Sequence, residues 1–206
     1  MSTADSALIL GGGKSTRMGF DKKNLELDGN NVLISLITKL RSIFSEVLVS
    51  SNDPFVYENV TTLHDELGDG PMAGIYQGLK HCKSEYLYVT ACDMPFISIP
   101  YIHYIREIVM TRQVDVCVAR HDDGSYEPFN AFYNKSCLTY IYDALLRKEY
   151  RPRMVFAIAN CCIVEPSTFE RFNDNGKMFF NINSKKDLEI LQGTDVTGDG
   201  CGKPNG

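Results

Sequence analysis

The sequence predicts an α/β fold, a three-layer α/β/α sandwich around a mainly parallel, Rossmann-like sheet. Short apolar runs alternate with segments of helical spacing through the first half of the chain, which is the order that builds a parallel sheet. The first apolar run opens into a glycine-rich loop. Polar residues also follow the ends of later runs, where sheets of this kind bind their ligands.

In the first half of the chain, each expected element follows from its apolar spacing. Buried runs predict strands over residues 6–10, 46–51, 60–64, 86–92 and 114–119. Apolar residues three or four apart predict helices over residues 32–44, 72–82 and 98–111. Asn31 and Ser98 are suited to cap the first and third helix, and Pro100 lies near the first turn of the third. Gly74 and Gly78 share one face of the second helix, which would allow close packing against the sheet or a ligand.

The second half is less regular. A turn-rich loop is expected over residues 121–126, a strand over 129–133 and a helix over 136–148. A helix opening at residues 151–153 and running to about 159, a strand over 161–164 and a final helix over 185–191, capped by Ser184, complete the pattern. From Gly193 the apolar periodicity is lost. We therefore predict one domain over residues 1–192 and a flexible tail over residues 193–206.

Composition excludes several classes of function. The chain has 206 residues, 44% of them hydrophobic, with a net charge of -5, so the broad basic surface that nucleic acid requires is not expected. Its seven cysteines are odd in number and form no CxxC pair, which argues against a zinc site or a disulfide framework. This cysteine pattern fits a reduced, cytoplasmic compartment best. We find no signal peptide and no apolar run long enough to span a membrane.

The loop after the first strand is typical of a phosphate site. Glycines let backbone N–H groups approach an anion, and four cations follow within ten residues: Lys14, Arg17, Lys22 and Lys23. The sequence nevertheless does not match either of two familiar phosphate-binding motifs. The segment Gly13–Thr16 has the GK[ST] end of a P-loop, but Leu8 stands where the first glycine is needed. The GxGxxG fingerprint fails because Thr16 stands at its third glycine.

A carboxylate follows the clearest strand of the chain. Asp93 comes directly after the run 86–92 and precedes Met94 and Pro95. Mg²⁺ takes oxygen ligands and needs few protein groups when phosphates supply the others. We therefore favour Asp93 as a Mg²⁺ ligand over a turn-forming Asp before Pro95.

These motifs together carry a resemblance to a known family. The segment LILGGGKSTRMGFDK resembles the L-x-G-G-x-S-x-R-M-G-x-D-K signature of the molybdenum cofactor guanylyltransferase (MobA-like) family. That family belongs to the nucleotidyltransferases with a GT-A-like sheet. Gly12 and the Asp21–Lys22 pair favour the guanylyl branch over cytidylyl relatives, whereas Gly11 stands where Ala is common. Further similar segments are DELGDGPMAG, CDMP, EPFNAFY and FNINS, so the resemblance spans roughly residues 8–191.

The resemblance implies transfer of GMP from GTP to molybdenum-molybdopterin, with the guanine dinucleotide cofactor and pyrophosphate as products. Arg17, Lys22 and Asp93 would be catalytic: the two cations would neutralise the triphosphate, and Asp93 would hold Mg²⁺. Nucleotide and acceptor would contact the following residues: Leu10, Gly11, Gly12, Gly13, Lys22, Asn52, Asp65, Gly70, Pro71, Asp93, Asn181 and Asn183. Asn183 could equally shape the start of the last helix. Lys14 and Lys23 would be secondary phosphate contacts.

Candidate partners follow from the same resemblance. They are GTP, molybdenum-molybdopterin, the molybdoenzymes that receive the product and an accessory GTP-binding protein. No nucleic acid or membrane partner is expected. The alternatives are another nucleotidyltransferase of this fold, either a CTP-dependent molybdopterin cytidylyltransferase or a sugar-phosphate enzyme, and a non-catalytic nucleotide-binding module. The four histidines (His64, His81, His103 and His121) are scattered and show no ligand spacing.

Overall fold

The computed structural model describes residues 3–11, 25–52, 55–64, 66–68, 70–173 and 176–191. Its first elements are β1 (Ser6–Leu10), β2 (Glu26–Leu27), β3 (Asn30–Asn31), α1 (Val32–Arg41), β4 (Glu46–Ser50), β5 (Thr61–Leu63), α2 (Pro71–His81), β6 (Tyr86–Ala91) and α3 (Ile99–Arg112). The remaining elements are β7 (Val116–Arg120), β8 (Tyr126–Asn134), α4 (Cys137–Leu146), α5 (Arg153–Phe156), β9 (Cys161–Val164), α6 (Pro166–Phe169), the 3₁₀ turn η2 (Glu170–Phe172) and α7 (Lys185–Leu191).

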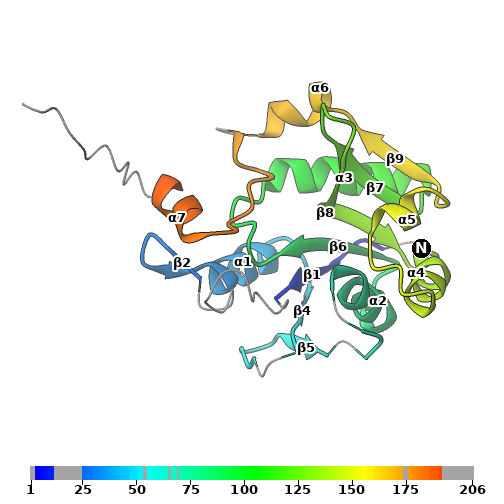
Figure 1. The fold of residues 1–206 in the computed structure, drawn as a ribbon, viewed down its shortest axis with the longest axis horizontal. Helices are drawn as coiled ribbons and strands as arrows, with labels where there is room; N and C mark the ends of the chain where they lie inside the picture. The colour runs from blue at the N-terminus through cyan, green and yellow to red at the C-terminus, as the bar shows by residue number, and fades with distance from the viewer. Residues whose placement is uncertain are drawn as a thin grey trace, which may run out of the picture.

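Within the described residues, a seven-stranded sheet has the order β5-β4-β1-β6-β8-β7-β9 (Figure 1). The pairs β1–β4, β1–β6, β4–β5 and β7–β9 are parallel, whereas β8 is antiparallel to both β6 and β7. The predicted mainly parallel, Rossmann-like sheet is therefore confirmed. Because β8 runs in the opposite direction, its first residue, Tyr126, lies at the edge where the parallel strands end.

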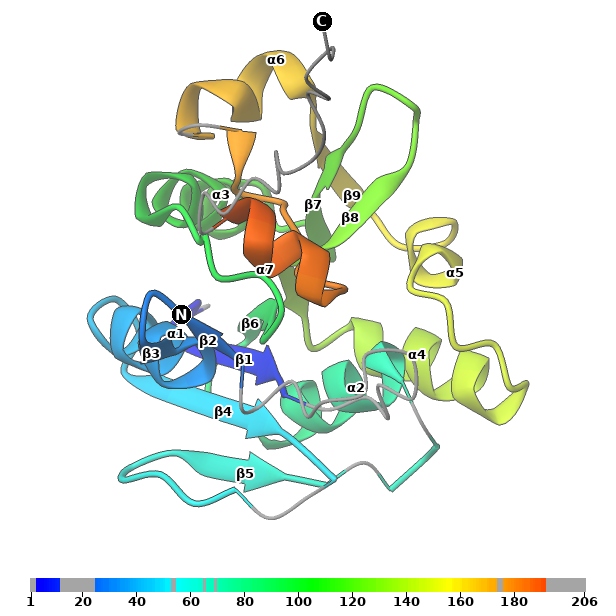
Figure 2. The same ribbon diagram turned by 60° about the vertical axis from the view of Figure 1, so that its left-hand side comes forward.

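Helices cover both faces of this sheet, and β1 shows why. Ala7 and Ile9 point into a core built with α1 and α3, while Leu8 and Leu10 point into a second core built with α2 and α4. Successive side chains of a strand alternate between faces, so a fully buried strand must be apolar on both. The three-layer arrangement expected from the sequence is confirmed (Figures 1 and 2).

The helix boundaries follow local chemistry. The Asn31 side chain accepts a hydrogen bond from the Ile34 backbone N–H at 3.0 Å and begins α1. The Ser98 hydroxyl accepts one from the Tyr101 N–H at 3.4 Å and begins α3. Ser184 does the same for Asp187 at 3.2 Å at the start of α7. All three predicted caps are confirmed, because each rests on a contact within one turn.

Several expected boundaries were wrong. α1 ends at Arg41 rather than residue 44, and α5 is a single turn instead of a helix to residue 159. β8 begins at Tyr126, inside the region expected as a loop. The start of this strand was not predicted because Pro128 lies within it. The register between β7 and β8 shifts between Cys117 and Ala119, and a proline within such an irregularity need not break the ladder. The hairpin β2–β3, α6 and η2 were not expected from the sequence.

Candidate active site at the carboxyl edge of the sheet

Gly11 follows β1 directly and packs against the end of β4. Its N–H donates to the Ser50 carbonyl oxygen at 2.8 Å. A Cβ on Gly11 would lie 3.1 Å from Val49 Cγ1 and 3.2 Å from the Ser50 carbonyl oxygen, so a side chain would push the two strand ends apart. Leu10 is buried beside it. Gly12, Gly13, Arg17 and Lys22 lie outside the described residues, as does Asp65.

The first turn of α2 reaches the same strand ends. A Cβ on Gly74 would lie 2.6 Å from Leu10 Cδ2 and 2.8 Å from Ser50 Oγ, so this glycine permits the close packing expected for it. Gly70 precedes the helix with φ of 107° and Pro71 is its first residue. The structure thereby brings Gly70 and Pro71 to the edge where β1 and β4 end. Asn52 lies two residues beyond β4 at that edge.

Asp93 lies two residues beyond the end of β6 and is 8% exposed. Its backbone carbonyl oxygen accepts a hydrogen bond from the Ile182 N–H at 2.8 Å. That contact brings the segment containing Asn181 and Asn183 next to Asp93, although the two are far apart in the sequence. The structure therefore assembles the candidate metal ligand and the two candidate acceptor residues in one place.

Asn183 also has a local structural role. Its N–H donates to Asp187 Oδ2 at 2.7 Å, and Asp187 is at the same time held by the Ser184 hydroxyl. The backbone of Asn183 thus helps to start α7, one of the two roles considered for this residue. Its side chain is exposed, and Nδ2 lies 3.5 Å from the Asn181 carbonyl oxygen.

The structure adds two residues to this edge that the site prediction missed, Glu127 and His121. Glu127 Oε2 lies 3.6 Å from His121 Nε2, and Glu127 is 7% exposed. Burial raises the pKa of Glu127, opposed by the hydrogen bond from the Phe129 N–H and by His121, while the charge of Asp93 raises it further. Asp93 after β6, His121 after β7 and Glu127 in β8 therefore lie close together where the parallel strands end.

Asn130 fixes the strand that carries Glu127. Its Oδ1 accepts from Tyr88 Oη at 2.6 Å and from Thr90 Oγ1 at 3.2 Å, and its Nδ2 donates to the Met178 carbonyl oxygen at 3.0 Å. It also has φ of 49°, a conformation that Asn adopts more readily than most residues. Asn130 thereby joins β6, β8 and the segment that leads to Asn181.

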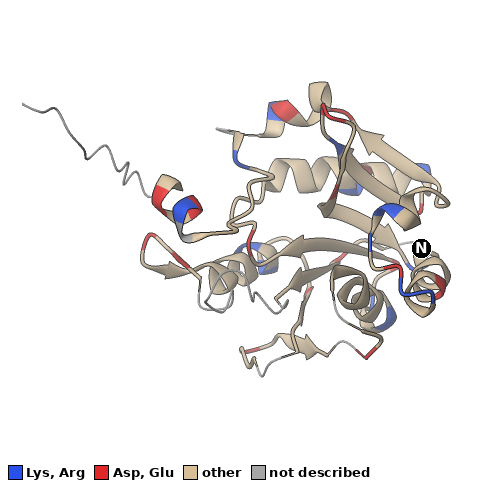
Figure 3. Ribbon diagram, in the orientation of Figure 1, with Lys and Arg blue, Asp and Glu red and all other residues tan. Residues whose placement is uncertain are grey.

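A cavity of about 640 Å³ opens beside this edge. Its lining residues come from the β7–β8 turn, the start of β8, and α5 with the residues on either side of it: Gly124, Ser125, Tyr126, Pro128, Arg151, Pro152, Arg153, Phe156 and Ala157. The rings of Tyr126 and Phe156 meet edge to face, 5.4 Å apart. Figure 3 shows the basic residues of α5 and the loop before it in blue. Two arginines beside aromatic rings suit an anionic ligand with a flat ring system.

The described parts of the chain hold neither a clustered metal site nor a membrane span. No group of three or more His, Cys, Asp or Glu side chains is placed to hold a metal ion in these parts of the chain. None of the described helices combines the length and apolar character that crossing a bilayer requires.

A mainly parallel sheet with Gly11 directly after one strand and the buried Asp93 after its neighbour is typical of nucleotide-binding α/β proteins. A family model described as a MobA-like NTP transferase domain matches residues 7–161. A molybdenum cofactor guanylyltransferase from Syntrophotalea carbinolica is 37% identical over 188 residues, 89% of each chain. A probable molybdenum cofactor guanylyltransferase from Peptoclostridium acidaminophilum is 34% identical, covering 98% of this chain and 92% of that one. The chain belongs to the MobA-like NTP transferase family.

Solved structures agree on the fold. Molybdopterin-guanine dinucleotide biosynthesis protein A from Archaeoglobus fulgidus superposes with a TM-score of 0.81 at 23% identity, covering 92% of this chain and 97% of that one. The 2-C-methyl-D-erythritol 4-phosphate cytidylyltransferase of Thermus thermophilus gives a TM-score of 0.65 at 17% identity, with coverages of 93% and 98%. Proteins with this fold thus include one named for a guanine dinucleotide and one named a cytidylyltransferase. The fold alone therefore does not indicate which base the nucleotide carries.

Proposed function

We propose that this protein transfers GMP from GTP to molybdenum-molybdopterin and releases pyrophosphate. The observation that carries the proposal is the 37% identity, over 89% of the chain, to a relative named molybdenum cofactor guanylyltransferase. The carboxyl edge of the sheet supports it, because Gly11, Asp93 and the segment 181–183 meet there. The acceptor phosphate is already an anion, so the reaction needs positioning and charge neutralisation rather than a general base.

The roles of the loop residues are part of this proposal. Backbone groups from Leu10 to Gly13 would hold the nucleotide, and Arg17 and Lys22 would neutralise the triphosphate as pyrophosphate leaves. A second set of residues would address the base and ribose: Asn52, Asp65, Gly70 and Pro71. In support, Gly74 brings the start of α2 against the ends of β1 and β4.

The donor set at Asp93 fits Mg²⁺. Its carboxylate is a hard oxygen ligand, buried at the strand end, and Mg²⁺ in such sites commonly uses one or two carboxylates together with phosphate oxygens and waters. When bound, the ion would neutralise phosphate charge at the reacting group. The contribution of the chain is to hold Asp93 in place, through the Ile182 N–H on its carbonyl oxygen and the burial of its side chain.

We assign the acceptor to the cavity at the start of β8. Arg151 and Arg153 would bind the acceptor's anionic groups, and the rings of Tyr126 and Phe156 would contact its ring system. Asn181 and Asn183 would contact the acceptor next to Asp93. On this assignment the nucleotide lies at the ends of β1 and β4, and the acceptor lies at the start of β8. Cytoplasmic location, receiving molybdoenzymes and an accessory GTP-binding protein remain predictions.

The test is a transfer assay with purified protein, Mg²⁺ and molybdenum-molybdopterin, run separately with GTP, CTP and ATP. Chromatography of the released nucleotide product, with pyrophosphate measured in parallel, identifies the base transferred. We expect guanine dinucleotide product from GTP alone. Turnover of CTP without GTP would replace the guanylyl assignment with the cytidylyl alternative, and binding without turnover would favour a non-catalytic module.

A further inference from the structure

Two cysteines lie side by side at one edge of the sheet, away from the strand ends described above. Cys117 in β7 and Cys162 in β9 are register partners on neighbouring parallel strands. Register partners on adjacent strands project their side chains to the same face. Consistent with this, Cys117 belongs to the core beneath α3, and Cys162 packs against that same core.

The spacing of the pair suits a disulfide. Neighbouring strands lie about 4.8 Å apart, within the Cα separation of roughly 4.4–6.8 Å that disulfides span. The two thiols are close enough for each to affect the pKa of the other. The six described cysteines, including this pair, are free thiols. Bond formation would therefore need oxidation but little movement of the backbone.

The two thiols differ in their access to solvent. Cys117 is fully buried, whereas Cys162 is partly exposed. β9 is the last strand in the sheet order and pairs only with β7 among the described strands, so Cys162 can meet a small reagent from solvent. Cys117 can be reached only through its neighbour.

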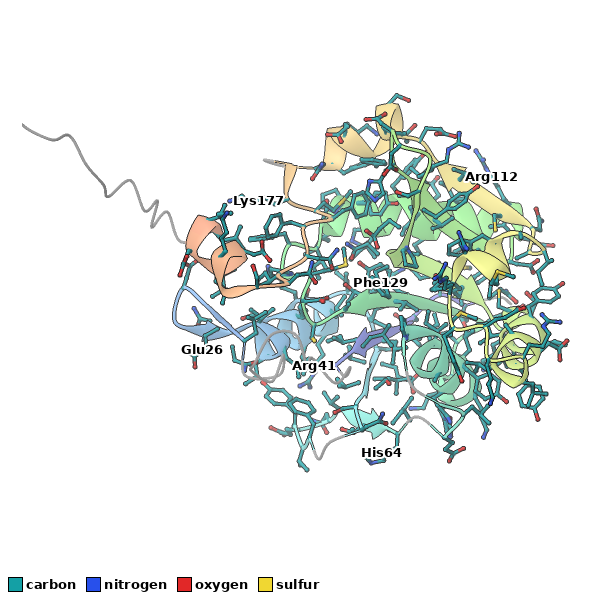
Figure 4. All side chains as sticks on the ribbon, in the orientation of Figure 1. Glu26, Arg41, His64, Arg112, Phe129 and Lys177 are labelled. Atoms are coloured by element: carbon teal, nitrogen blue, oxygen red, sulfur yellow. The ribbon has the colours of Figure 1, made fainter. Side chains whose placement is uncertain are left out.

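A cation stands next to the accessible thiol. Arg112, which is labelled in Figure 4, is the last residue of α3. Its Nη1 lies 3.6 Å from Cys162 Sγ. The hydrogen bond from Cys117, and after it the Arg112 guanidinium, lowers the pKa of Cys162 to about 6 against the opposing effect of burial. Burial instead raises the pKa of Cys82 and Cys161 to about 11 and that of Cys137 to about 12.

We propose that Cys162 is a reactive thiol that peroxides oxidise, with Cys117 as its resolving partner. The Cys162 thiolate attacks one peroxide oxygen, the O–O bond breaks, and the leaving oxygen takes up a proton to give water or an alcohol. The Cys162 sulfenic acid then condenses with the Cys117 thiol. An S–S bond forms, the S–O bond breaks and one water leaves. Overall the peroxide is reduced by two electrons and the thiol pair is oxidised by two.

The product would tie edge strand β9 to β7 near its middle. Arg120, the last residue of β7, and Glu165, which directly follows β9, already form an ion pair with 2.6 Å between Nη2 and Oε1. A disulfide in this position would therefore strengthen an existing strand contact rather than create a new one. No residue assigned to the transfer reaction takes part, so the proposal stands independently of the proposed function.

The first test uses the full-length wild-type protein, reduced and then treated with about one equivalent of hydrogen peroxide. Peptide mapping without reductant should find Cys117 linked to Cys162. Before oxidation, brief alkylation with iodoacetamide at neutral pH should label Cys162 at least about ten times faster than Cys161, its neighbour on β9. Faster labelling of any other of the six described cysteines, or no link between the two peptides, would overturn the proposal.

Variants separate the parts of the mechanism. Arg112→Gln should slow alkylation of Cys162 several-fold, whereas Arg147→Gln, an exposed arginine elsewhere, should leave the rate unchanged. Cys117→Ala should stop oxidation at the sulfenic acid, trapped on Cys162 by dimedone, while Cys161→Ala should form the disulfide as in wild type. Equal rates in Arg112→Gln and wild type would contradict the role of the guanidinium. If Cys117→Ala does not fold, peptide mapping of the wild-type protein and the alkylation rates of Arg112→Gln and wild type still test the proposal.

Discussion

The imidazole Nε2 of His121 lies 3.6 Å from the carboxylate Oε2 of Glu127, at the edge where β7 ends and β8 begins. The ring of His121 also meets Phe179 edge to face, 5.4 Å between centroids. Glu127 is in turn close enough to Asp93 for their charges to interact. The turn between β7 and β8 thereby places a titratable pair close to the proposed metal ligand.

Replacing Glu127 with Gln should change how stability depends on pH. Burial raises the pKa of Glu127 above its ordinary value of 4.5. Between pH 4.5 and the raised pKa, the folded protein therefore binds more protons than the unfolded chain. Wild-type stability therefore falls as pH rises through that window. Gln does not titrate and keeps an oxygen for the Phe129 N–H, so Glu127→Gln should gain stability relative to wild type as pH rises.

Urea unfolding of both proteins at pH values from 4.5 upward, starting at the ordinary pKa of the carboxyl group, measures this difference. Glu170→Gln, on the exposed turn η2, is the matched control and should follow wild type throughout. A difference between Glu127→Gln and wild type that does not vary with pH would show that the carboxyl group keeps its ordinary titration when buried.

Asp93→Asn should abolish most of the transfer activity without unfolding the protein. The amide has the shape of the carboxylate but lacks its charge, and the backbone bond from Ile182 to residue 93 is unaffected. We expect kcat to fall by about 100-fold or more, measured as pyrophosphate release at saturating GTP. Asp143→Asn, on the exposed side of α4, is the control. Full Mg²⁺-dependent turnover in Asp93→Asn would exclude Asp93 as the metal ligand.

Arg153→Ala should weaken binding of the acceptor and leave GTP binding unchanged, because Arg153 lines the cavity assigned to the acceptor and Gly11, at the end of β1, does not. A hydrogen bond to a charged group contributes roughly 1.5–3 kcal/mol, so the KM for the acceptor should rise about tenfold or more. The control is Arg147→Ala, whose guanidinium pairs with Glu149 outside the cavity. An increased KM for GTP with an unchanged KM for the acceptor would move the nucleotide into this cavity.

Features set by neighbouring residues could be predicted from the sequence. β1, the Asn31 cap and the position of Asp93 after β6 each depend on a few consecutive residues, and all three were placed correctly. The proximity of Asn181 and Asn183 to Asp93 was expected from the family resemblance, not from local chemistry. The pairing of His121 with Glu127 was missed, because it depends on where β8 begins and hence on a register shift around Pro128 that local propensity does not reveal.

Gly78→Ala should destabilise the protein even though alanine is the better helix former. A Cβ at this position would lie 2.6 Å from Leu8 Cδ2 and 2.7 Å from Leu87 Cδ2, and both leucines are fully buried, so their methyl groups have no open space to enter. Overpacking of this kind costs roughly 1–3 kcal/mol, which exceeds the gain of about 1 kcal/mol in helix propensity. Denaturant unfolding should show a lower midpoint for Gly78→Ala, while Lys80→Ala on the exposed face of α2 should remain within about 0.5 kcal/mol of wild type. A stabilised Gly78→Ala would mean that α2 can move away from β1 and β6 at little cost.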